Sequence, residues 1–317
     1  MHIAEAGSGP LVLLLHGFPE CWYSWRHQLT ALARAGFHAV APDQRGYCRT
    51  GPPGSNGAGV DGGPAQVDDY TMLHLTGDVI GLMDALGADQ AVVAGHDWGA
   101  PVAWNTALLR PDRVRGVVGL SVPYRPRGSG STPPLELLRA FYTDGFYICY
   151  FQQPGVADAE LSRDPQATFR RLLVAASGDG PLDGTPVVPP GGGFLDICPE
   201  PETLPAWLTS DDIDVFVAEF AESGFTGPLN WYRNLDRSWE LMGAWQDAPV
   251  TVPALYLAGD RDLVVAFSGG PGMLAQLKDS APQLREPVLL PGCGHWTQQE
   301  RPDEVSQAMI EFIGSLD

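Results

Sequence analysis

The run Gly95-His96-Asp97-Trp98-Gly99 is the feature that most constrains how this chain can fold. It follows an aliphatic segment at Ala91–Ala94, which predicts a buried strand, and it precedes a helical pattern at Val102–Leu109. Glycine at both ends permits a strained strand-to-helix turn, because larger side chains would clash across it. Such a turn pushes its middle side chain, here Asp97, into a pocket, although an aspartate that only caps the following helix is the alternative.

Strand-like and helix-like segments alternate on both sides of this turn. Aliphatic runs predict strands at Leu11–Leu15, His38–Ala41, Ala91–Ala94, Val117–Val122, Ala254–Ala258 and Val288–Leu290. Apolar residues at helical spacing predict helices at Trp22–Arg34, Met72–Leu86 and Val102–Leu109. The alternation predicts an α/β fold with a mostly parallel, doubly wound sheet.

The alternation stops in the middle of the chain, where the sequence is helical and aromatic. We therefore expect a helical cap at residues 124–247, inserted between two parts of an α/β core at residues 1–123 and 248–317. A Gly/Pro-rich stretch inside the cap, Ser177–Pro205, predicts a surface loop, and the glycine-rich segment Gly51–Gln66 predicts a mobile loop.

Composition excludes several classes of function. The net charge of -19 makes nucleic acid and anionic membranes unsuitable partners, because phosphate contacts need clustered lysine and arginine. No apolar run approaches the roughly 20 residues of a membrane span, and no signal peptide is recognisable. The five cysteines show no CxxC spacing and the histidines no metal-ligand spacing, so we expect a reducing cytoplasm, no metal and no cofactor.

A carboxylate nucleophile at Asp97 narrows the chemistry. It displaces a leaving group from sp3 carbon and forms an alkyl-enzyme ester that water must then hydrolyse. The fold requires an acid and then a histidine later in the chain. Asp262 and His295 follow predicted strands in that order, so we expect His295 to activate water and Asp262 to orient its ring. Asp260 is the alternative acid.

The run His16-Gly17-Phe18-Pro19-Glu20 follows the first aliphatic strand and predicts the oxyanion hole. The backbone N–H groups of Phe18 and Trp98 are the expected donors to the oxygen that becomes negative. Pro19 fixes the turn, with a cis peptide as one option. We expect the substrate pocket to be lined by Phe18, Pro19, Trp98 and Trp296, whereas His16, His38 and His96 are interpreted as structural.

These motifs resemble the epoxide hydrolases of the α/β-hydrolase fold, both bacterial enzymes and the hydrolase domain of the vertebrate soluble enzyme. The resemblance covers nearly the whole chain, through HGFPE (16–20), DQRGY (43–47), GHDWGAPVAW (95–104), GHW (294–296) and the cap segments at 147–155 and 224–234. It implies that Tyr147 and Tyr232 hold the epoxide oxygen and donate a proton as the ring opens. Tyr150, one helical turn beyond Tyr147, is the reserve for that role.

Departures from the family pattern are visible at three places, one of which is the unusually glycine-rich loop Gly51–Gln66. Cys48 stands after RGY, where glycine is usual, and residues His2–Gly7 resemble the family's second strand, so we expect its first strand to be missing or shortened. The predicted function is hydrolysis of a small-molecule epoxide to a vicinal diol by a monomer or homodimer. A haloalkane or haloacetate dehalogenase with the same Asp97 ester, and a catalytically silent binding protein, are the alternatives.

Overall fold

A seven-stranded sheet forms the centre of the computed structural model, which describes residues 1–51, 66–181, 184–269 and 271–316. The strand order is β1-β3-β2-β4-β5-β6-β7, and β1 is antiparallel to β3 while the other neighbouring pairs are parallel. The bounds are β1 Ile3–Ala6, β2 Leu11–Leu15, β3 His38–Pro42, β4 Ala91–His96, β5 Val114–Leu120, β6 Ala254–Gly259 and β7 Val288–Leu290.

The strands predicted from aliphatic runs are confirmed, with the largest shift in β5. This strand begins at Val114 and not at Val117, because Val114 and Gly116 pair with β4 across a local shift of register. Arg115 interrupts the aliphatic run there, so the hydrophobic pattern did not predict the first residues of the strand. At the other end, Ser121 takes a φ of 67° and ends the strand before the predicted Val122.

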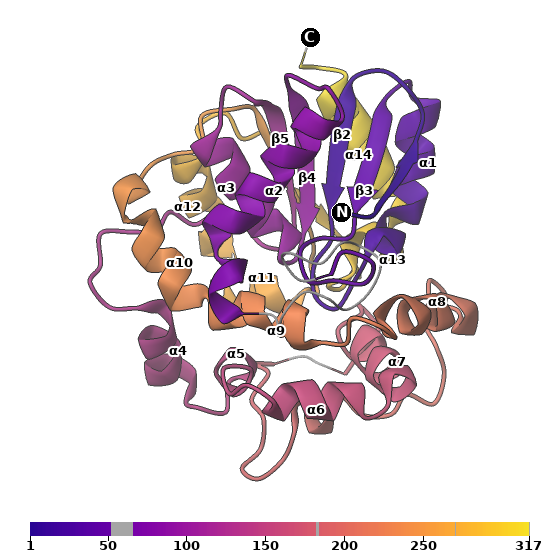
Figure 1. Ribbon diagram of the computed structural model, residues 1–317, viewed down its shortest axis with the longest axis vertical. Helices are drawn as coiled ribbons and strands as arrows, with labels where there is room; N and C mark the ends of the chain where they lie inside the picture. Colours follow the sequence, from indigo (N-terminus) through magenta and orange to yellow (C-terminus); the bar gives the residue numbers. More distant parts are fainter. Residues whose placement is uncertain (52–65, 182–183, 270, 317) are drawn as a thin grey trace.

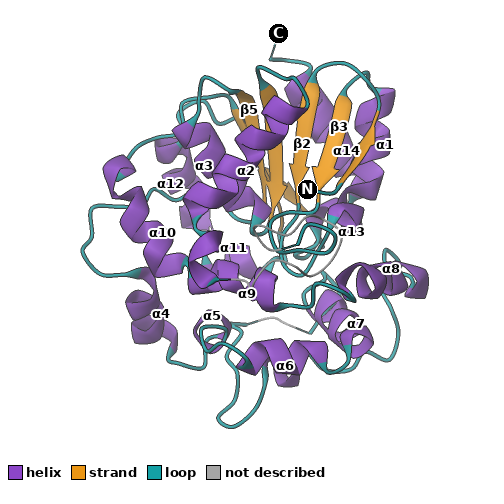
Figure 2. Cartoon of the chain, in the orientation of Figure 1, coloured by secondary structure: helices purple, strands orange, loops and turns teal. Residues whose placement is uncertain are grey.

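Helices cover both faces of the sheet, as Figures 1 and 2 show. Side chains alternate along β2, so that Leu11, Leu13 and Leu15 join a core with α2 and α3, while Val12 and Leu14 join a core with α1 and α14. The doubly wound arrangement is therefore confirmed. The bounds are α1 Arg26–Arg34, α2 Met72–Ala85, α3 Gly99–Leu109, α11 Leu263–Phe267, α12 Pro271–Ser280, α13 Thr297–Glu300 and α14 Pro302–Ile313, with 3-10 turns η1 Trp22–Trp25 and η2 Val67–Tyr70.

A layer of helices between β5 and β6 lies across the carboxyl ends of the strands (Figure 1). We call residues 134–245 the helical layer. It has an aromatic core of its own, in which Phe169 packs on Phe216, Phe220 and Phe225 with ring centroids 5.0–5.8 Å apart. Its elements are α4 Pro134–Tyr142, α5 Tyr147–Tyr150, α6 Val156–Ser162, α7 Pro165–Ala175, η3 Phe194–Ile197, α8 Ser210–Phe220, α9 Thr226–Arg233, α10 Leu235–Leu241 and η4 Met242–Trp245.

The structure tests only one of the two loop predictions for the glycine-rich and Gly/Pro-rich segments. Nearly all of Gly51–Gln66 lies outside the described residues. Ser177–Pro205 is largely irregular, as predicted, but it is not confined to the surface, since the short turn η3 carries Phe194 into the interior and Cys198 is fully buried. Within the described ranges, no helix combines the length and the apolar character needed to cross a bilayer.

The helical layer should depend on Phe169 for its stability. Its ring has no exposed surface, so Phe169→Ala leaves a cavity among three aromatic partners and should lower the free energy of unfolding by about 3–5 kcal/mol. Phe141→Ala is the matched control, because Phe141 is 78% exposed and its loss should change stability by less than about 0.5 kcal/mol. Urea denaturation measures both, and equal effects would contradict the assigned core.

Candidate active site

The turn between β4 and α3 holds Asp97 in an unusual backbone conformation. Asp97 has a φ of 48°, in the left-handed region that costs a side-chain-bearing residue about 1–2 kcal/mol. Only glycine fits at Gly99, since a Cβ there would lie 2.1 Å from the Leu15 carbonyl oxygen. The predicted strand–turn–helix elbow is therefore present, with the carboxylate of Asp97 facing the cavity described below.

The segment after β2 approaches this carboxylate closely. A Cβ on Gly17 would lie 2.3 Å from the Cβ of Asp97, so the glycine brings the next peptide against the acid. The Phe18 N–H donates to Asp97 Oδ1 at 2.7 Å, and the Phe18–Pro19 peptide is cis. In the described part of the chain, the Trp98 N–H makes no hydrogen bond to the resting carboxylate, and its predicted role concerns the position of the later oxyanion.

His295 lies between two carboxylates. Its Nε2 is 3.5 Å from Asp97 Oδ2, and its Nδ1 is 3.1 Å from Asp262 Oδ1. Asp262 is fixed by the Val264 N–H at the start of α11, at 2.9 Å. The alternative acid, Asp260, is exposed and accepts the Gly292 N–H at 2.7 Å, away from the imidazole. The geometry therefore brings Asp97, His295 and Asp262 together and leaves Asp260 out.

Ser121 is a contact of His295 that the sequence reasoning missed. Its Oγ lies 3.1 Å from Nδ1 of His295. The Tyr256 hydroxyl donates to the Ser121 carbonyl at 2.6 Å and helps to hold its left-handed backbone. Its position in the sequence could have indicated this contact. Ser121 directly follows β5, and the carboxyl ends of parallel strands meet at one edge of a sheet.

The charges in this group are strongly coupled. Burial opposes ionisation of Asp97, but the hydrogen bond and charge of His295 outweigh it and lower the pKa of the carboxyl below its ordinary value. Burial also opposes the charging of His295, yet Asp262 and then Asp97 raise the pKa of its imidazole well above 6.5. The resting site is therefore an imidazolium held between two carboxylates.

A cavity lies next to Asp97 and His295, and both residues line it. Tyr147 and Tyr232 line it from the helical layer, and Phe18 and Trp296 line it from the sheet side. Of the four predicted pocket residues, Phe18 and Trp296 line this cavity, while the pocket role of Pro19 and Trp98 stays a prediction. Residues not anticipated from sequence complete the wall: Phe151, Leu172, Ala176, Pro186, Phe194, Leu263 and Val264.

Trp98 and Pro19 each have a fixed environment next to the cavity. The indole of Trp98 packs edge-on against the rings of Tyr232 and Trp231, at 5.1 and 5.9 Å. Pro19 is buried in a tight turn closed by the hydrogen bond from the Glu20 N–H to the Gly17 carbonyl at 3.0 Å.

The two tyrosines come from separate helices and meet over the nucleophile. Tyr147 begins α5 and Tyr232 lies near the end of α9, with ring centroids 6.1 Å apart. Burial and then the charge of Asp97 raise the pKa of both phenols, so both remain protonated. The hydroxyl of Tyr150 is engaged with Glu160 at 2.7 Å, outside the cavity lining.

The buried histidines outside this group have protein partners. His16 accepts the Gln44 N–H at 3.0 Å. His96 lies 2.8 Å from Glu20 through Nδ1 and 2.7 Å from the His295 carbonyl oxygen through Nε2. These contacts brace the oxyanion segment against the loop that carries His295, in keeping with the structural interpretation of both residues.

The fold and the site define the class of protein first. The strand order, the elbow and the histidine between two acids are those of an α/β hydrolase with a carboxylate nucleophile, and the family model described as the alpha/beta hydrolase fold matches residues 10–168. Among curated relatives, epoxide hydrolase A of Mycobacterium tuberculosis is 45% identical over 100% of this chain and 95% of that protein. The chain belongs to the epoxide hydrolase family.

Solved structures agree. The epoxide hydrolase from an endophytic Streptomyces is similar at a TM-score of 0.90 and 45% identity, covering 99% of this chain and 92% of that one. Epoxide hydrolase A from Mycobacterium thermoresistibile is similar at a TM-score of 0.88 and 48% identity, covering 99% and 95%. The likeness therefore extends over the sheet and the helical layer together.

The coupling between Asp97 and His295 predicts a measurable change in proton affinity. Asp97→Asn removes a negative charge that stabilises the imidazolium, so the pKa of His295 should fall by about one unit or more. Asp260→Asn is the matched control, since this exposed acid lies on the same loop as Asp262 without contacting the ring. NMR titration of the imidazole protons measures both variants. An unchanged pKa in Asp97→Asn would contradict the coupling.

Proposed function

We propose that this enzyme adds water to an epoxide and releases a vicinal diol through a covalent ester on Asp97. The observation that carries the proposal is the placement of two protonated phenols, Tyr147 and Tyr232, across one cavity from a buried carboxylate. A nucleophile therefore faces two proton donors across one cavity with a mostly apolar wall, as a site for a small organic molecule requires. The family relationship supports the same reaction.

Ring opening follows from this geometry. Oδ1 of Asp97 is held by the Phe18 N–H, which leaves Oδ2 to attack one epoxide carbon as the bond from that carbon to oxygen breaks. The departing oxygen would become an alkoxide, a strong base, so it takes a proton from Tyr147 or Tyr232. The products of this step are a hydroxyalkyl ester of Asp97 and a tyrosinate that the second phenol can stabilise by a hydrogen bond.

Ester hydrolysis then depends on a change in the charge of the site. Esterification removes the negative charge of Asp97, so the pKa of His295 falls. The imidazolium then gives its proton to the tyrosinate, directly or through water, which restores the phenol and leaves the neutral imidazole as a competent base. The imidazole removes a proton from water while the resulting hydroxide attacks the ester carbonyl carbon of Asp97. The N–H groups of Phe18 and Trp98 stabilise the oxyanion, and Asp262 stabilises the imidazolium. As the oxyanion collapses, the bond from the acyl carbon to the alkyl oxygen breaks and the imidazolium returns its proton to that oxygen, so the diol departs and the Asp97 carboxylate is regenerated.

We further propose that residues 124–247 act as the cap of the active site and supply the acids, while residues 1–123 and 248–317 supply the nucleophile and the base. Free, buried cysteines among the described residues support a reducing cytoplasm as the working compartment. The net charge of -19 supports a small molecule rather than a nucleic acid as the partner. We expect a monomer or a homodimer.

The dehalogenase alternative needs N–H donors around a leaving halide. The indole of Trp98, the first candidate, packs edge-on against the ring of Tyr232, and the indole N–H of Trp296 is already donated to the Leu173 carbonyl at 2.7 Å. A halide leaves as a stable anion and gains nothing from two phenols of raised pKa. The complete set of nucleophile, base and acids likewise argues against a silent binding protein.

The phenols should decide whether the ring opens. With styrene oxide as substrate, the Tyr147→Phe plus Tyr232→Phe variant should form diol about 10²–10⁴-fold more slowly than wild type, because the alkoxide has no proton donor. Tyr150→Phe is the matched control and should retain activity, since its hydroxyl binds Glu160. Chromatography of the diol gives the rates. Halide release from haloalkanes by wild type, without diol formation from the epoxide, would refute the proposal.

His295 should act after the ester has formed. His295→Gln should still alkylate Asp97 but hydrolyse the ester slowly, so intact-protein mass spectrometry should show an adduct of one substrate molecule. In wild type, one turnover with excess enzyme in heavy-oxygen water should place the label in Asp97 before the diol, because water attacks the ester carbonyl. Label that enters the diol directly while Asp97 stays unlabelled would exclude the covalent route.

A further inference from the structure

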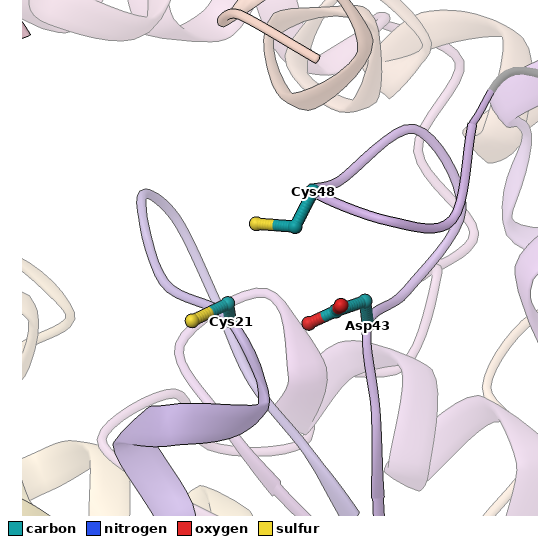
Figure 3. Close-up of side chains that lie close together, drawn as sticks. All are labelled: Cys21, Asp43 and Cys48. Carbon is teal, nitrogen blue, oxygen red and sulfur yellow. The ribbon is translucent and has the colours of Figure 1, made fainter. Parts of the chain in front are cut away.

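Two thiols and a carboxylate converge at a point outside the catalytic group. Cys21 follows the oxyanion segment, Asp43 follows β3, and Cys48 lies in the turn beyond it (Figure 3). One potential ligand atom from each side chain lies within 4.8 Å of the other two, and all three residues are buried. We call Cys21, Asp43 and Cys48 the thiol cluster, and none of them lines the catalytic cavity.

Cys48 occupies its place at a cost in backbone energy. Its φ of 47° is in the left-handed region, which glycine adopts freely and cysteine does not. The turn is fixed by a hydrogen bond from the Cys48 N–H to Ser223 Oγ at 3.0 Å, and glycine at this position would make the same bond. What the cysteine adds to the turn is therefore its thiol, whose sulfur lies within 4.8 Å of a ligand atom of Cys21 and of Asp43 (Figure 3).

The surroundings of the thiol cluster are negative. Asp43 accepts the Trp22 N–H at 3.1 Å through Oδ1 and is 2.7 Å from His2 Nδ1 through Oδ2, which fixes the carboxylate plane. Glu219, itself buried, acts electrostatically on both thiols, and its Oε2 has no hydrogen-bond partner. Its other oxygen is paired with Arg49 at 2.6 Å. A cation between the thiols would lie in the field of two carboxylates.

We propose that Cys21, Cys48 and Asp43 bind one thiophilic divalent cation, Zn²⁺ or Cd²⁺. Two sulfurs and one carboxylate oxygen are a donor set suited to these ions, with a fourth position left for water. A Zn–S bond of about 2.3 Å places two sulfurs of a tetrahedral site about 3.8 Å apart. Ligand atoms that already lie within 4.8 Å of one another need only small movements to reach that geometry. His2 would orient the Asp43 ligand from outside the coordination sphere.

The metal-binding reaction conserves atoms and charge. The buried thiols carry their protons in the metal-free protein, since burial raises the pKa of each. One M²⁺, two thiols and one carboxylate give one dithiolate-carboxylate complex and two released protons, with no oxidant or reductant involved. The bound ion would tie the end of the oxyanion segment to the turn that contacts Ser223 of the helical layer.

The experiment is a Cd²⁺ titration of the full-length, tag-free protein, stripped of metal and kept reduced with a phosphine. The thiolate-to-cadmium charge-transfer absorbance should rise to an end point of one ion per chain, and Cd²⁺ should raise the thermal midpoint of unfolding. Cys48→Gly should fold, turn over epoxide like metal-free wild type, and bind Cd²⁺ more than about 100-fold more weakly, because a direct ligand is lost. Cys21→Ser should be weakened similarly.

Cys198→Ala is the matched control, because it removes a buried thiol of the helical layer that is distant in the chain from the cluster. It should keep the end point and the affinity of wild type. Equal binding by wild type and Cys48→Gly would overturn the proposal, as would the absence of a charge-transfer band in wild type. A disulfide between Cys21 and Cys48 would equally overturn the proposal. It would appear as two fewer free thiols before reduction, and the reduced protein would bind no Cd²⁺. Epoxide turnover by wild type is measured separately, so failure here leaves the hydrolase function standing.

Discussion

The close approach of Gly17 to Asp97 is the constraint on which the rest of the site depends. A side chain on Gly17 would overlap the Cβ of Asp97, and the left-handed turn at Asp97 exists because Gly99 allows the elbow to press against the end of β2. The same two contacts aim the nucleophile and bring the Phe18 N–H to its oxygen. Nucleophile and oxyanion donor are thus set before substrate binds, which is how fixed dipoles lower a barrier without later reorganisation.

The second organising element is the position of one imidazole between two acids. The charge of His295, then its hydrogen bond and those of Ser121 and Val264, lower the pKa of Asp262 below its ordinary value despite burial. In the proposed reaction, Asp97 is ionised only until it is alkylated. The proton affinity of His295 therefore follows the state of the nucleophile, high in the free enzyme and lower in the ester. The loss of the Asp97 charge therefore makes His295 a base only for hydrolysis of the ester.

Much of this was predictable from sequence, and the remainder has identifiable causes. Buried parallel strands are continuous aliphatic runs, so the sheet and the elbow at Asp97 followed from local pattern. Ser121 was missed because a single serine after a strand has no distinctive neighbours. Phe194 was missed because its segment is rich in glycine and proline, which predicts irregular backbone but not depth of burial. The approach of Cys21 to Cys48 depends on tertiary folding, which no spacing rule in the chain records.

The apolar wall of the cavity has a chemical consequence for the two phenols. Apart from Asp97, His295, Tyr147 and Tyr232, the side chains that line it are apolar or aromatic, so little water competes for the departing oxygen. Burial makes each phenol a weaker acid, but the same environment makes an aliphatic alkoxide a stronger base, because both anions lose hydration. Proton transfer to the alkoxide remains favourable, whereas transfer to the resting Asp97 carboxylate does not. The apolar wall therefore allows protonated phenols and an ionised Asp97 carboxylate to share one cavity.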